Sequence, residues 1–110
     1  MKGTHLGEFE ELVLLVVGIL NGNAYGITVM DEIKQHTGRK VSISTIHSTL
    51  ARLEKKGFIE SHVGGASPTR GGRSKRIYKI NAEGQQALEK AKIQREKLWN
   101  LLPKNLFSHG

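Results

Sequence analysis

The sequence predicts a mainly α-helical domain with one small β-hairpin, on three observations. The chain has 110 residues, which is the size of one domain. Apolar residues recur at helical spacing in four segments. Two short strand-like runs flank a glycine-rich stretch near residue 71. The expected order is therefore helix, helix, helix, hairpin, helix. The absence of cysteine excludes disulfides, thiolate zinc sites and cysteine nucleophiles.

The first helix is expected over about residues 7–21. Three glutamates fall in its first turn, where the positive end of the helix dipole favours acids. The run from Leu12 to Leu20 is apolar on nearly every face, so this helix should be buried all round. A small domain can hardly surround a helix completely, so we expect a partner chain to cover one side at Leu12 and Leu15. The run is too short for a membrane span, which needs about 20 residues.

A second helix is expected over about Tyr25 to His36, after a turn at Asn21-Gly22-Asn23. Gly38 suits the left-handed cap that ends such a helix. Its core-facing stripe should consist of Ile27, Met30 and Ile33.

A third helix should begin at a cap formed by Ser42 or Ser44 and should run to about Lys56. Gly57 is expected to stop it, and the residues at its start, Val41 to Ile43, are expected to add one small strand. Helical spacing places four apolar residues on the core side: Ile43, Ile46, Leu50 and Leu53.

The hairpin is expected to pair residues 58–63 with residues 73–80, through a connection rich in turn formers. The stretch from Ser61 to Ile80 contains five bases and no acid. Arginine is favoured in the minor groove of DNA, and cations can also follow a phosphate strand. Four of these bases are therefore candidate DNA contacts: Arg70, Arg73, Lys75 and Arg76.

A last helix should be capped by Asn81, continue to about Leu102 and be closed by Pro103. Its apolar stripe, with Trp99 beside it, is a candidate dimer interface together with the first helix. The candidate interface residues on it are Leu88, Ala91, Leu98, Trp99 and Leu102. We therefore expect a DNA-binding domain over residues 1–80, a dimerisation helix over 81–103 and a flexible tail over 104–110.

Two helices joined by a short turn and followed by a basic hairpin form the winged helix-turn-helix arrangement. The later helix of the pair, the recognition helix, enters the major groove. The third helix suits this role, because its only acid, Glu54, lies late. Short hydroxyl side chains let the backbone approach the bases, and cations neutralise phosphates. The candidate DNA contacts on it are Ser44, Thr45, His47, Ser48, Arg52 and Lys55.

The net charge of +7 is carried entirely by residues 61–110, because residues 1–60 are neutral. A one-sided basic field attracts a polyanion, although a basic surface kept for solubility would look the same. A single Arg-Gly-Gly-Arg also occurs in RNA-binding repeats, but one copy is a weak signal. We therefore expect double-stranded DNA as the partner, with a palindromic operator bound by a homodimer.

Several short pieces stand in a specific order and spacing. They are Leu6-Gly7-Glu8-Phe9-Glu10, Ala24-Tyr25-Gly26-Ile27, Val41-Ser42, residues 50–59, residues 70–78 and Asn81-Ala82-Glu83-Gly84. In these pieces, from about Leu6 to Leu88, the chain resembles the PadR family of bacterial transcriptional regulators. The resemblance implies a homodimeric repressor with a winged domain and a C-terminal dimerisation helix. Some members of the family release DNA on binding small aromatic compounds and others are not known to have a ligand, so the resemblance leaves both open. Two positions depart from the family pattern: His47 replaces the usual tyrosine, and Asn81 the usual threonine.

Some alternatives remain open at this stage. Trp99 is a candidate wall of an aromatic effector site at the dimer interface, although plain packing is the simpler interpretation. Tyr25 could contact a phosphate through its hydroxyl or simply pack. The five histidines lack ligand spacing, and no nucleophile–base–orienter set is present, so we expect no metal, cofactor or enzyme activity. We expect a cytoplasmic protein without a membrane span. The main alternative function is a winged-helix module that binds an acidic protein partner.

Overall fold

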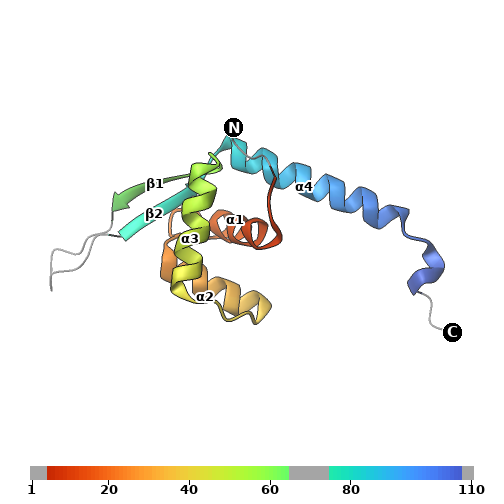
Figure 1. Cartoon of the computed structure of the whole chain (residues 1–110), viewed down its shortest axis with the longest axis horizontal. Helices are drawn as coiled ribbons and strands as arrows, with labels where there is room; N and C mark the ends of the chain where they lie inside the picture. The colour runs from red at the N-terminus through yellow and green to blue at the C-terminus, as the bar shows by residue number, and fades with distance from the viewer. Residues whose placement is uncertain (1–4, 65–74, 108–110) are drawn as a thin grey trace.

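The structure is a computed structural model and describes residues 5–64 and 75–107. Its elements are α1 (Glu8–Leu20), α2 (Gly26–Thr37), α3 (Ile43–Lys55), β1 (Ile59–Gly64), β2 (Lys75–Ile80), α4 (Ala82–Leu101) and a 3-10 helix, η1 (Lys104–Phe107). In Figure 1, α1 and α2 lie below the hairpin, α3 rises beside its inner end, and α4 runs away from them. The predicted fold class, a mainly helical winged helix-turn-helix with one β-hairpin, is confirmed.

The ends of the helices follow local rules of capping. Ser42, rather than Ser44, caps α3, because its Oγ accepts the N–H of Thr45 at 3.2 Å. Asn81 caps α4 as predicted, its Oδ1 accepting the N–H of Gly84 at 2.9 Å. Gly57 follows α3 with a φ of 86°, a conformation that glycine adopts without strain. The chain therefore turns sharply from α3 into β1.

The core lies where α1, α2 and α3 meet the hairpin. The prediction that Ile27 faces this core is wrong, since Ile27 is 49% exposed. Gly26 is buried against α3 instead, so the inward positions of α2 are residues 26, 29 and 33, with Met30 at the edge. Thr49 is also fully buried, which the apolar spacing of α3 does not predict. The buried apolar residues are Val13, Leu14, Val16, Val17, Ala24, Val29, Ile33, Ile46, Leu50, Leu53, Phe58, Ile59 and Tyr78.

The hairpin is antiparallel, in a register that pairs Ile59 with Ile80 and Gly64 with Lys75. The small strand predicted at Val41 to Ile43 is wrong, because Ser42 begins a helix there at once. Ala24, and not the segment before α3, forms an isolated β-bridge with Tyr78 of β2. Its carbonyl accepts the N–H of Tyr78 at 2.8 Å, and this bond fixes the α1–α2 connection against the wing.

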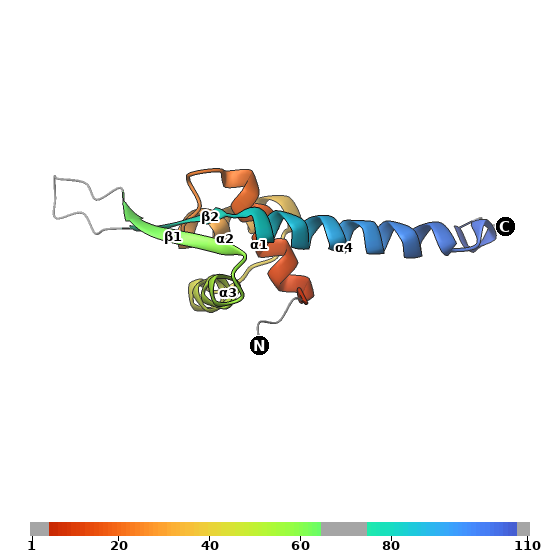
Figure 2. The same ribbon diagram turned by 90° about the horizontal axis from the view of Figure 1, so that it is seen from above.

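The fourth helix extends beyond the rest of the molecule (Figure 2). The Cα radius of gyration is 16.8 Å, whereas a compact chain of this length measures about 13 Å. Residues 104–107, in the tail predicted to be flexible over residues 104–110, form η1. Within the described residues, no helix is both long enough and apolar enough to cross a membrane.

Candidate nucleic-acid interface

Helix α3 presents two rows of side chains side by side. Residues at i, i+4, i+7 and i+11 align along a helix. One such row consists of Ser44, Ser48, Ala51 and Lys55, and all four are exposed. The second row consists of Thr45, Thr49, Arg52 and Lys56. Because Thr49 in the second row is fully buried, that row borders the domain and the first row lies at the centre of the exposed face.

The N-terminal turn of α3 carries a cluster of hydroxyl groups. The Oγ of Ser42 is 2.9 Å from that of Thr45 and 3.1 Å from that of Ser44. The hydroxyl of Ser48 donates to the carbonyl of Thr45 at 3.1 Å. These side chains are exposed and short, so they leave the helix backbone accessible to a nucleic acid.

His47 lies at the junction of α3 with α2 and the wing. A Cβ added to Gly26 would collide with its imidazole ring, so glycine at that position makes room for the ring. His47 lines a hollow of about 530 Å³. The other residues around this hollow come from α2, its N-cap, α3 and β2: Tyr25, Gly26, Ile27, Ile43, Lys75, Arg76 and Tyr78.

Two cations of strand β2, Lys75 and Arg76, are linked to the body of the domain, Lys75 directly and Arg76 through Ser61 of β1. Lys75 Nζ donates to the Tyr25 hydroxyl at 3.3 Å and lies 4.3 Å from the centre of its ring. Arg76 Nη1 donates to Ser61 Oγ at 2.9 Å, and Ser61 donates to a carboxylate oxygen of Glu54 at 2.7 Å. Strand β2 therefore brings two positive charges to the same hollow as His47. The two other predicted wing contacts, Arg70 and Arg73, lie outside the described residues.

A carboxylate from α1 engages the border row of α3. Glu10 Oε1 accepts from Lys56 Nζ at 2.7 Å and from the N–H of Gly7 at 2.8 Å. Its Oε2 accepts from Arg52 Nε at 3.3 Å. Burial of Glu10 disfavours its charged form, but the hydrogen bonds from Lys56, Gly7 and Arg52 outweigh this, so the pKa of Glu10 lies below its ordinary value. The sequence pattern assigned Glu10 to the first turn of α1 and to a family motif, and it did not predict these contacts with α3.

The predicted interface residues on α1 and α4 fall into two groups. Leu12, Leu88 and Ala91 are half-buried. Leu15, Leu98, Trp99 and Leu102 are exposed, and Trp99 shows 64% of its surface. Three exposed apolar residues of the same helices were not predicted: Ile19, Ile93 and Leu101.

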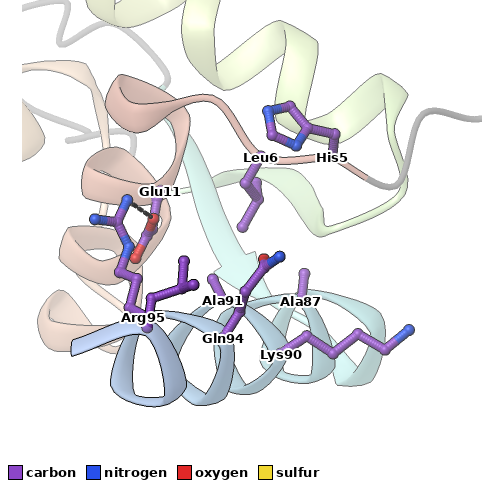
Figure 3. Close-up of a pocket in the computed structure, with 9 residues that line it drawn as sticks. His5, Leu6, Glu11, Ala87, Lys90, Ala91, Gln94 and Arg95 are labelled. Atoms are coloured by element: carbon purple, nitrogen blue, oxygen red, sulfur yellow. Dashed lines mark hydrogen bonds and ion pairs between the residues drawn. The ribbon is translucent and has the colours of Figure 1, made fainter. Parts of the chain in front are cut away.

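A second hollow separates the N-terminal segment from α4 (Figure 3). His5 and Leu6 lie on one side of it, and the alanines 87 and 91 lie on the other. An ion pair of 2.8 Å between Arg95 and Glu11 closes one end. This pair joins α4 to α1 within one chain. Over the described part of the chain, no three His, Asp or Glu side chains gather closely enough to hold a metal ion.

The chain is similar to known proteins in sequence and in fold. The model of the transcriptional regulator PadR-like family matches residues 13–90. A PadR-like regulator from Bacillus cereus has a TM-score of 0.71 at 23% identity, with 92% of this chain and 93% of that chain covered. A PadR family regulator from Eggerthella lenta has a TM-score of 0.70 at 25% identity, with 93% and 88% covered. Bacillus subtilis PadR, solved in complex with operator DNA, has a TM-score of 0.66 at 20% identity, with 77% and 47% covered. No curated protein matches the chain in sequence.

Proposed function

The chain belongs to the PadR-like family of transcriptional regulators, and on this premise we propose that it is a homodimeric repressor of bacterial genes. It binds a palindromic operator in double-stranded DNA, in the cytoplasm. The helix-turn-helix is α2 with α3, and the wing is the hairpin of β1 and β2. The solved complex of Bacillus subtilis PadR with operator DNA supports double-stranded DNA as the partner.

The observation that carries this proposal is the meeting of α3 and β2 at one hollow. His47 of α3 lines it together with Lys75 and Arg76 of β2. A helix in the major groove and a wing on the adjacent backbone must approach DNA from the same side of the protein. A surface with this arrangement can meet a groove and its phosphates together.

The residues at this surface take different roles in the proposal. Ser44, Ser48 and Lys55 belong to the row at the centre of the exposed face of α3, and this row faces the groove. Thr45 and His47 flank this row and read base edges. The wing cations Lys75 and Arg76 neutralise phosphates, together with Arg70 and Arg73 of the connection. Such contacts supply affinity and register, whereas base contacts supply sequence choice. Arg52, the remaining candidate contact on α3, differs from these residues because its guanidinium already donates to Glu10.

The dimer forms through the exposed apolar side chains of α1 and α4. A single chain leaves Leu15, Leu98 and Trp99 largely exposed, and in the described part of the chain α4 extends past the other helices and the hairpin (Figure 2). Burial of apolar surface is the main driving force of association. Residues 1–80 then act as the DNA-binding unit and 81–103 as the dimerisation helix. Trp99, the only tryptophan of the sequence, packs in that interface. A small aromatic effector would bind there against its ring.

Selection of bound sequences from random duplex DNA tests the proposal. The expected result is a palindrome whose half-sites lie about 34 Å apart, one helical turn, as two-fold related recognition helices require. Sedimentation at two protein concentrations should show a dimer. Failure to bind any duplex at low ionic strength would refute DNA regulation and favour a protein-interaction module. A stable monomer would refute the dimer alone.

A further inference from the structure

The cation-rich end of α3 contains three basic residues in two different environments. Lys55 continues the central exposed row, and no described residue forms an ion pair with it. Arg52 and Lys56 lie one helical turn apart in the border row, and both reach Glu10 of α1. The recognition helix therefore presents one uncompensated positive charge at this end, although its sequence contains three.

Glu10 is well placed to bind both cations. Its side chain is only 10% exposed, and both of its carboxylate oxygens accept hydrogen bonds. Lys56 is also bound to the carbonyl of His5 at 2.8 Å, so it is fixed from two sides. Arg52 is held from two sides as well, since its Nη2 lies 3.4 Å from the hydroxyl of the buried Thr49.

Arg52 nevertheless remains within reach of a ligand, because 56% of its side chain is exposed. It lies one turn beyond Ser48 on a helix that we propose to enter the major groove. A DNA phosphate that binds this guanidinium would meet the negative charge of Glu10, which already accepts from its Nε. Non-specific affinity comes almost entirely from such phosphate contacts, so a carboxylate that engages an interface arginine lowers non-specific affinity first.

We propose that Glu10 is a specificity-determining residue, which limits binding to non-operator DNA by holding Arg52 away from the phosphate backbone. The proposal rests on the DNA-binding function proposed above. It makes Glu10 a competitor of the nucleic acid rather than only a structural anchor. Base contacts by the central row are unaffected by it, so Glu10 raises the ratio of specific to non-specific affinity.

The test compares Glu10→Gln with Glu11→Gln. Glutamine can still accept the hydrogen bond from Gly7, so the start of α1 is kept, but the negative charge that attracts Arg52 is lost. Glu11 is the matched control, because it lies next to Glu10 and its ion pair is with Arg95 on α4. Both variants change the net charge equally, and only the first removes the charge that Arg52 and Lys56 contact.

Binding to a random duplex is measured by fluorescence anisotropy across salt concentrations. Each new phosphate contact adds about 0.9 to the slope of log K against log salt. One released Arg52 in each protomer of a dimer should therefore steepen the slope of Glu10→Gln by about 0.9 to 1.8. With a slope steeper by 0.9, lowering the salt from 1 M to 0.1 M should raise the affinity of the variant about eightfold more than it raises that of the wild type. Glu11→Gln should keep the wild-type slope.

Arg52→Ala provides an arm that does not depend on the folding of Glu10→Gln. In the wild-type background it should leave the slope nearly unchanged, and in the Glu10→Gln background it should remove the gain. A slope that falls by about 0.9 or more in Arg52→Ala alone would overturn the proposal, as would equal slopes in Glu10→Gln and Glu11→Gln. Wild-type protein that binds no duplex would instead refute the DNA-binding function itself, and the inference with it.

Discussion

Alanine at both Lys75 and Arg76 should weaken binding to every duplex sequence and flatten its salt dependence. These two cations line the hollow beside His47, and we propose one phosphate contact for each. Two contacts in each of two protomers correspond to a loss of about 3.6 from the slope of log K against log salt. When the salt concentration is doubled, the factor by which affinity falls should be about twelve times smaller for the variant than for the wild type.

The assay is fluorescence anisotropy on an operator duplex and on a random duplex at four or more salt concentrations. Operator and random affinities should fall by similar factors, because phosphate contacts carry no sequence information. The matched control is Lys92→Ala with Lys97→Ala, which removes the same charge from exposed positions on α4. Far-ultraviolet circular dichroism and urea titration should show that the double variant keeps its fold, although the contact of Lys75 with Tyr25 is lost.

Two results would refute this reasoning. An unchanged slope in the double variant would mean that the wing does not touch the phosphate backbone. An equal loss of slope in the α4 control would mean that net charge, rather than the position of the two cations, governs binding.

Three further outcomes can be checked on the purified protein. Gly84→Ala should lower the free energy of unfolding by about 2 kcal/mol in urea titrations, because its Cβ would collide with the carbonyl of Phe58. Gly18→Ala, whose Cβ would meet no atom within 4 Å, should instead raise it by up to about 1 kcal/mol; equal effects would contradict the packing argument. Because the pKa of Glu10 is lowered on folding, its contribution is complete above the ordinary value of 4.5 and is lost as the pH falls through the folded pKa. Acid should therefore destabilise the wild type more than Glu10→Gln, and parallel stability curves would count against this. Trp99→Ala should raise the dimer dissociation constant about 30-fold, for a contact of about 2 kcal/mol, as sedimentation can measure, and an unchanged constant would place Trp99 outside the interface.

Much of the fold could be predicted because it depends on residues near one another in the sequence. The caps at Asn81 and Gly57 are examples, since each uses a side chain or a backbone conformation within a few residues of the helix end. The exposure of Ser44 and Lys55 follows equally from the helical period of α3. The same reasoning failed for Ile27, because the period of α2 is clear but its rotation about its own axis is set by how closely Gly26 approaches α3.

The candidate site divides along the same line. The sequence alone predicts the order of the helices, the carboxylate-poor face of α3 and the basic hairpin after it, because each of these is a property of one segment. Only the tertiary structure decided which cations are paired. Glu10 lies 42 residues from Arg52 and 46 from Lys56, and Tyr25 lies 50 residues from Lys75. Whether such charges meet depends on how α1 and the wing pack against α3, and that packing is determined by the shape of the shared core rather than by the spacing within any one segment.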